Sequence, residues 1–369
     1  MKQESENKVY SMQKVRTATS LVANIQQHIE EERHNEALRT LNGLVEDNGQ
    51  VIMESLDISI VDLASAIGTL YARLGQFRDA EKYFRHVWEV RRKLLGENHH
   101  STLMAYVDLF EVLLELEKAS ILVVAEMYNA AHGSLGGEHP TSSRCAFLLA
   151  QCQMQDSDYD VANDLLDKCL QKQQETLGID DKATLKTMAV HGKCLALQGN
   201  LQQAKSILEE CIQKQTSLFG AECADVLWSR FELAEVARKI AYDQTEDMYR
   251  DVLAMQAKTL GDQHAHTAIS QFALASMYFE QGRLEEVEPL LLSSIEVFQR
   301  ALGPEHERTL TAQKNLTALR YALPTSIAEG SPEAVQKVQY WATVFWVGLI
   351  LSLLLSYGCG QIKTLWLAP

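Results

Sequence analysis

A dipeptide ending in glycine recurs along the chain at almost equal intervals, and this repeat restricts the possible folds more than any other feature. Successive glycines are 40, 42, 42, 41 and 42 residues apart. Such self-similarity indicates a repeat array, in which units stack on their neighbours and none needs a complete core of its own. The dipeptides are Leu95-Gly96, Leu135-Gly136, Leu177-Gly178, Phe219-Gly220, Leu260-Gly261 and Leu302-Gly303.

The residues before each glycine form a helical stripe. Sixteen residues before it the side chain is small or slim, and four and eight residues later it is apolar or aromatic. This spacing follows one face of an α-helix, and the small residue lets a neighbouring helix approach closely. Glycine then ends the helix, because it adopts the left-handed conformation without steric cost. The three sets are Ala80, Ser120, Ala162, Ala204, Thr245 and Val287; Phe84, Val124, Leu166, Leu208, Tyr249 and Leu291; and Trp88, Tyr128, Leu170, Ile212, Leu253 and Ile295.

After each glycine, a His-x-x-Thr pattern opens the next helix, and it is complete at His99, His264 and His306. We expect the hydroxyl of this pattern to cap free N–H groups in the first helical turn. A second apolar stripe follows and ends at a turn. The turn is clearest at Gly75, Gly199 and Gly282.

Each unit is therefore a helix, a turn, a second helix and a glycine stop. The sequence predicts an all-α protein: a right-handed α-solenoid of stacked helix–turn–helix repeats followed by a single transmembrane helix. The expected organisation is a flexible N-terminus (1–18), a repeat array of about seven helix pairs with a degenerate first unit (19–322), a linker (323–331), the transmembrane helix (332–360) and a short tail (361–369).

These residues resemble tetratricopeptide repeats of the 42-residue kind found in kinesin light chains. The stretch QGRLEEVEPLLLSSIEVFQRALGPEHERTL (281–310) carries the resemblance most fully, and HNEALRTLNGLVED near the start is similar to a degenerate leading unit. The resemblance covers about residues 19–322 and implies the solenoid fold. It says much less about the ligand.

The C-terminal part departs from the repeat, since the 25 residues from Val338 to Ile362 carry no charge. Its apolar centre, Trp341–Gly360, spans about 30 Å as a helix, which is the hydrocarbon thickness of a bilayer. Trp341 and Tyr357 stand near its ends, as interfacial aromatic side chains do, and Trp346 lies within it. The sequence therefore predicts a membrane span.

Few residues follow this span, so we expect insertion after translation and a repeat array that faces the cytosol. The expected location is a single-pass, tail-anchored protein of the endoplasmic reticulum or the mitochondrial outer membrane. The alternative is a helix that plugs the concave groove of the array. A groove-bound helix should keep a polar face, however, and this segment has none.

Composition and motifs argue against several function classes. The chain has 49 Asp and Glu against 34 Lys and Arg, a net charge of −15, and no basic run, which makes nucleic acid an improbable partner. No nucleotide-binding, nucleophile-elbow or zinc-protease motif occurs, so we expect no enzyme activity and no cofactor. Seven cysteines without a CxxC pair indicate free, mostly buried thiols. Histidines such as His99-His100 and His264/His266 lack ligand spacing, so we interpret them as packing residues at helix starts rather than metal ligands.

Partner-binding residues are expected on the inner face of the first helix of each unit, where arrays of this kind hold extended peptides. In the kinesin light chain pattern, an asparagine nine residues beyond the histidine holds a peptide backbone, and only Asn315 keeps that residue here. Two acidic residues at this position favour a basic or apolar ligand. The candidates that the resemblance implies are Asp108, Leu148, Val190, Glu232, Ala273 and Asn315.

The function expected from these features is that of a membrane-anchored scaffold or adaptor that recruits a peptide or protein partner through the concave face of the array. The resemblance leaves open a kinesin light chain-like transport adaptor, although residues 1–50 show no sustained heptad pattern for pairing with a motor stalk. An assembly factor for a membrane complex would share all of these features.

Overall fold

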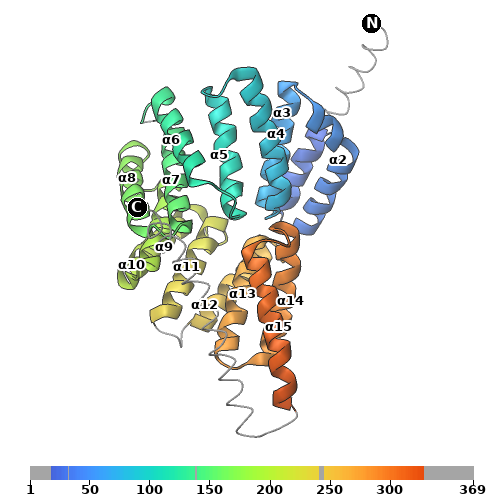
Figure 1. Ribbon diagram of the computed structural model, residues 1–369, viewed down its shortest axis with the longest axis vertical. Coiled ribbons are helices and arrows are strands. Elements are labelled where there is room, and N and C mark those ends of the chain that lie inside the picture. Colours follow the sequence, from blue (N-terminus) through green and yellow to red (C-terminus); the bar gives the residue numbers. More distant parts are fainter. Residues whose placement is uncertain (1–17, 32, 138, 241–244, 328–369) are drawn as a thin grey trace, which may run out of the picture.

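The computed structural model describes residues 18–31, 33–137, 139–240 and 245–327, and these residues form helices and turns without a strand (Figure 1). A helix at 18–30 comes first. It is followed by α2 (His34–Glu54), α3 (Ile58–Arg73), α4 (Phe77–Leu95), α5 (His100–Glu115), α6 (Ile121–Leu135), α7 (Pro140–Gln155), α8 (Tyr159–Thr176), α9 (Lys182–Leu197), α10 (Leu201–Phe219), α11 (Ala224–Ile240), α12 (Thr245–Thr259), α13 (Ala265–Glu280), α14 (Leu284–Ala301) and α15 (Glu307–Ile327).

Consecutive helices pack as antiparallel pairs, and successive pairs stack into a strongly curved array. The curvature closes the array into a ring, so that α4 lies against α14 although the two helices are far apart in sequence (Figure 1). The predicted all-helical solenoid is confirmed. Its closure is a feature that the repeat pattern did not predict.

The helical stripe packs as predicted at its first two positions, except that Ser120, the N-cap residue of α6, is exposed. Ala162 and Ala204 have no exposed surface, and neither do Leu166 and Leu208 four residues later. The third position was placed one residue too late, because two helical turns take 7.2 residues and the seventh residue therefore points closer to the core than the eighth. Cys211, for example, is fully buried.

The prediction that the Thr hydroxyl caps the helix start is wrong. The preceding imidazole does so: His264 Nδ1 accepts the backbone N–H of His266 at 3.1 Å, and Asp181 does the same for Ala183 at 2.8 Å. The hydroxyl instead donates to the carbonyl of the stop glycine, as from Thr267 Oγ1 to Gly261 at 2.9 Å. The reason is geometric, since the imidazole stands at the N-cap itself whereas the hydroxyl lies within the first turn.

Two further expectations concern the C-terminal part. The linker was predicted to begin at residue 323, but α15 continues to Ile327, because no glycine stop occurs there and Pro324 does not end the helix. The predicted span, with Trp341, Trp346 and Tyr357, lies outside the described residues. Within the part that is described, no helix combines the length and the apolar character needed to cross a bilayer.

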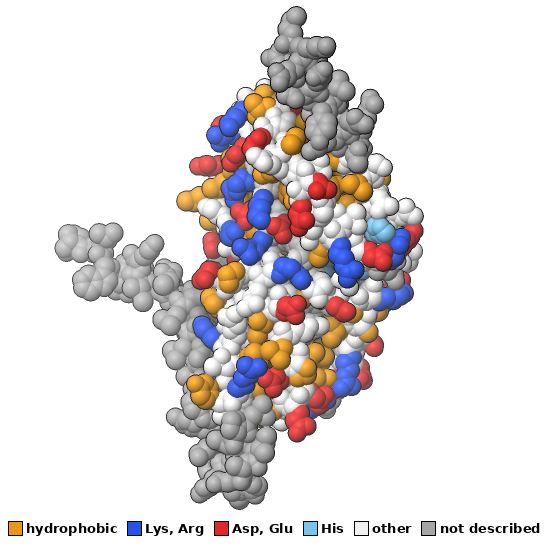
Figure 2. Space-filling model, turned by 90° about the vertical axis from the view of Figure 1, so that its right-hand side faces the viewer, with side chains coloured by type: hydrophobic (Ala, Val, Ile, Leu, Met, Phe, Trp, Pro, Cys, Tyr) orange, Lys and Arg blue, Asp and Glu red, His pale blue; other side chains and the backbone are white. Residues whose placement is uncertain are grey.

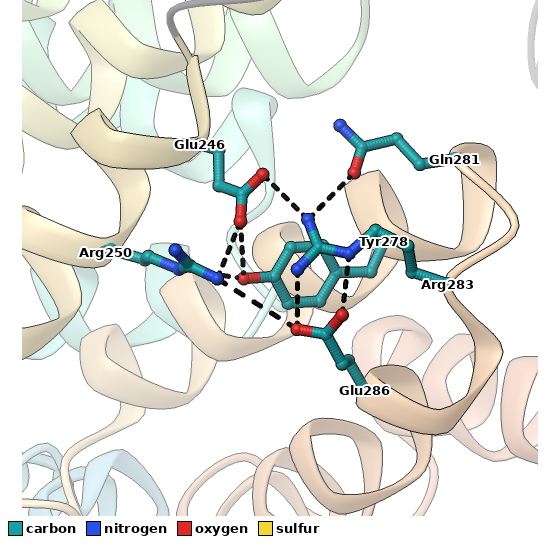
Figure 3. A network of polar contacts seen from close by, with 6 residues as sticks. All are labelled: Glu246, Arg250, Tyr278, Gln281, Arg283 and Glu286. Carbon is teal, nitrogen blue, oxygen red and sulfur yellow. Dashed lines mark hydrogen bonds and ion pairs between the residues drawn. The ribbon is translucent and has the colours of Figure 1, made fainter.

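A polar network joins α12, α13 and α14 (Figure 3). The guanidinium of Arg283 lies 4.1 Å from the ring centre of Tyr278 and forms bonds of 2.6–2.7 Å with Glu246 and Glu286. Arg250 pairs with Glu246 at 2.7 Å. These contacts tie α12, α13 and α14 together.

Candidate functional site: a channel inside the ring

Four adjoining cavities lie inside the ring, lined mainly by the first helices of the repeats. The largest, of about 620 Å³, lies between α3, α5 and α13. The others, of about 280, 230 and 200 Å³, are all lined by α9 and α11, together with α13 for the first and with α5 and α7 for the other two. Glu115 lines three of them and Trp228 lines three, so the cavities meet at these two side chains. We call the connected space the channel.

One wall of the channel opens into an apolar pocket between α9, α11 and α13. Its volume of about 280 Å³ exceeds that of an engineered cavity of about 150 Å³ known to bind benzene. It therefore has room for a large apolar side chain. The residues that define the apolar pocket are Leu197, Trp228, Phe231, Ile269, Phe272 and Phe298.

The charged residues of the channel are largely paired across neighbouring helices. Arg144 Nη2 lies 2.9 Å from Asp108 Oδ1 and 3.0 Å from Glu111 Oε1, and Lys193 Nζ lies 2.8 Å from Glu232 Oε1. On the outer face shown in Figure 2, basic and acidic side chains are likewise interspersed. The overall negative charge therefore does not translate into a simple acidic groove.

Glu115 differs from these carboxylates because its partner is a histidine. Oε2 of Glu115 lies 3.8 Å from Nε2 of His266. Burial would raise the pKa of Glu115, but His266, Arg308 and Lys193 outweigh it and lower the pKa to about 2. The carboxylate is therefore ionised at neutral pH, and its side chain is 38% exposed to the channel.

The predicted groove residues do not form one row. Asp108 lines the largest cavity, Val190 lines the two smallest, and Glu232 and Ala273 share the apolar pocket. Leu148 is fully buried in the core. Asn315, at 9% exposure, lines none of the four cavities. Their role in binding stays a prediction.

The repeat pattern did not identify Lys186, Lys193 and Trp228, which each line two or three of the channel cavities. Lys186 and Trp228 stand five residues after Asp181 and Cys223, the first positions of their repeat pattern, and Lys193 stands twelve after Asp181. These offsets lie about one helical turn on either side of the offset of nine that was chosen. Extending the stripe by one turn in each direction would have found them.

The repeated histidines act at helix starts. Nδ1 of His99 accepts the N–H of Ser101, and Nδ1 of His139 accepts that of Thr141, both at 3.2 Å. Across the described ranges, no group of three His, Cys, Asp or Glu side chains is arranged to hold a metal ion.

Comparison with known families identifies the repeat. Models of the tetratricopeptide repeat match residues 61–101, and residues 142–214 and 241–297. The chain therefore contains tetratricopeptide repeats. No curated protein matches it.

Two solved structures share the fold at TM-scores above 0.5, and a third is similar over about half of this chain, all at low identity. The complex of NprR with its cognate peptide NprX is 14% identical, with a TM-score of 0.56 over 87% of this chain and 94% of NprR. Aspartyl phosphate phosphatase F from Bacillus subtilis is 13% identical, with a TM-score of 0.53 over 81% of this chain and 75% of that one. The nearly identical repeats of a kinesin light chain candidate from Podosopora anserina are 22% identical, with a TM-score of 0.40 over 53% and 94%. At such identities the likeness concerns the fold alone.

Proposed function

We propose that this protein is a non-enzymatic scaffold that binds an extended peptide segment of a partner protein inside the channel. The observation that supports this most is the apolar pocket, which opens onto the channel beside the paired charges of Lys193 and Glu232. An apolar side chain of the segment would fill the pocket, and the polar groups around it would accept and donate hydrogen bonds. The NprR structure, which has the same fold, holds a peptide.

The chemistry of the channel favours the apolar over the basic alternative. Asp108 and Glu232 were expected to attract basic residues, but Arg144 and Lys193 already pair with them. A basic ligand would have to displace these partners. We therefore propose a segment anchored by a large apolar side chain.

The test uses peptides selected from a random dodecapeptide display library on the full-length protein, with affinities measured by fluorescence anisotropy. Trp228→Arg is expected to weaken binding at least tenfold, because losing the burial of one apolar side chain costs about 1.5–3 kcal/mol and 1.4 kcal/mol is tenfold. Leu122→Arg is the control, since Leu122 is 74% exposed on α6, outside the channel. Equal binding by both variants would place the ligand elsewhere.

We further propose that the apolar segment Trp341–Gly360 anchors the array to a membrane, so that weak binding in the channel acts on partners concentrated near that surface. The support is compositional, since this stretch of twenty predominantly apolar residues carries no charge and matches the thickness of a bilayer. Protease treatment of intact organelles, with a tag at the N-terminus, would identify the side that the array faces.

Alkaline extraction tests the anchor directly. The full-length protein is expected to stay with the membrane, and Leu351→Lys with Leu354→Lys is expected to release it, because each central lysine costs roughly 2.5–3.5 kcal/mol in a span. Leu122→Lys should have no effect. Release of the unaltered protein at high pH would contradict the anchor and favour a segment that packs on the array.

A further inference from the structure

The first and the last repeats of the ring, which we call its two arms, meet along a seam that holds the channel closed (Figure 1). On the first arm the seam consists of Gly75, Gln76, Glu115 and Glu117, and on the last arm of Gln263, Ala265, His306 and Arg308. Neighbouring repeats in a solenoid stabilise each other, but these residues belong to repeats about 190 positions apart. The seam is therefore an additional interface within the chain.

Directional hydrogen bonds hold the seam. Gln76, which is 2% exposed, donates from Nε2 to the carbonyl of Gln263 at 3.1 Å. His306 accepts the N–H of Arg308 at Nδ1, and burial lowers the pKa of this imidazole. In the neutral ring the proton must then lie on Nε2, which donates to the carbonyl of Glu115 at 3.3 Å.

Glu117 contributes to the seam from a strained backbone position. Its φ is +54°, while the equivalent turn positions of other repeats hold Gly75, Gly199 and Gly282 with φ of +69°, +88° and +75°. A side chain in this region is costly, and among the described residues only Glu117 and Ser157 adopt it without being glycine. The carboxylate of Glu117 lies 3.7 Å from His306 Nε2 and 3.8 Å from Arg308 Nε.

The seam is smaller than most contacts between consecutive repeats. Within the array, fully buried apolar side chains such as Leu166 and Leu208 join the helices over their whole length. The seam combines single hydrogen bonds, loose ion pairs and a glycine turn with a limited apolar contact, in which the ring of Phe77 lies 6.1 Å from that of His266. Far fewer residues meet between α4 and α14 than between most consecutive helices, so the ring can separate here at low cost.

We propose that the ring opens sideways at this seam to admit a segment into the channel and closes around it. That a segment enters rests on the proposed function, whereas opening is a property of the chain alone. Glu115 links the two events, because its carbonyl is bonded in the seam while its carboxylate lines three of the four channel cavities. Binding in the channel and closure of the seam therefore favour each other equally.

The test measures closure by cross-linking cysteines placed at Arg78 and Glu305, two exposed positions beside the seam. Arg78 Cδ lies 3.3 Å from a Cβ built on Gly303, two residues before Glu305. The full-length protein carries Arg78→Cys and Glu305→Cys, with Cys223 and Cys359 replaced by serine. The five buried thiols should stay unreactive toward a short bis-maleimide, because burial raises the pKa of Cys145 and Cys152 to about 12 and that of Cys169, Cys194 and Cys211 to about 11.

Glu117→Gly is the informative variant, and Ser157→Gly is its matched control. Both place glycine at a left-handed turn position, since φ is +54° at Glu117 and +64° at Ser157. Both should therefore fold at least as well as the parent, so unfolding cannot explain a difference between them. Only Glu117→Gly removes contacts to His306 and Arg308, and we expect it to slow cross-linking at least threefold while Ser157→Gly leaves the rate unchanged.

Equal rates in the parent and both variants, or no cross-link in the parent, would overturn the proposal. A peptide selected on the wild-type protein is added in a second arm and should raise the cross-linking rate of Glu117→Gly toward that of the parent. A peptide that binds without changing the rate would contradict the coupling. Failure to select any peptide would count against the proposed function, while the first arm would still decide whether the seam opens.

Discussion

Replacement of Leu208 by alanine is expected to lower the free energy of unfolding by about 2–5 kcal/mol. Leu208 is fully buried on α10, and a Cβ built on Gly192 of α9 would lie 2.8 Å from its Cγ. The leucine thus packs directly on the bare backbone of the neighbouring helix, and truncation leaves a cavity that the helices cannot fill easily. Urea denaturation followed by circular dichroism measures the loss.

Leu122→Ala is the control for this substitution, because Leu122 is 74% exposed on α6 and its truncation should change stability by less than about 0.5 kcal/mol. The loss in Leu208→Ala should also spread to adjacent repeats, since a repeat without its neighbour exposes an apolar face. A loss no larger than that of the control would mean that α9 and α10 do not pack through this contact.

Buried positions of this kind are predictable from the sequence for a simple reason. Leu166, Leu208 and Leu291 repeat because each is buried by its own helix pair, and this local requirement is visible as a period. The same holds for the stop glycines, for example Gly178 with φ of +95°. Fold class and helix pairing were therefore predictable from the sequence.

The functional face was less predictable, because a ligand-facing position need not repeat. The offset of nine residues identified Glu232 and Ala273 but also led to Leu148, which lies in the core. Trp228 was missed because it occupies a position filled by Lys186 in the preceding repeat, so no shared residue type marks it. Charge was misleading for a related reason: the pairing of Asp108 with Arg144 depends on two helices and is invisible in either alone.

The repeat pattern in the sequence could not predict that the ring closes, and Gly75 illustrates why. In the sequence it is one turn glycine among several, equivalent to Gly199. In the structure a Cβ on Gly75 would lie 2.7 Å from the backbone nitrogen of Ala265, whereas a Cβ on Gly199 would meet nothing within 4 Å. The difference arises from a contact between residues 190 positions apart, which no local period can encode.

Because of this contact, we expect Gly75→Ala to lower both the free energy of unfolding and the closure of the ring. Both Gly75→Ala and Gly199→Ala force alanine into a left-handed backbone, which costs about 1–2 kcal/mol. At Gly75 the methyl group also collides with the start of α13, and such overpacking costs about 1–3 kcal/mol more unless the helix moves away. We expect Gly75→Ala to be the less stable variant, and to lose the cross-link between positions 78 and 305 that Gly199→Ala retains.

Comparing Gly75→Ala with Gly199→Ala distinguishes the effect of backbone strain in a turn from the effect of losing ring closure. If the two variants lose the same free energy of unfolding and cross-link equally, the first arm does not rest against α13 in solution. If only Gly75→Ala loses the cross-link, the two arms depend on the absence of a single side chain for their contact. Glycine at position 75 then serves two purposes, a turn that every repeat needs and a close approach that only the ring needs, and the second purpose is the one that controls access to the channel.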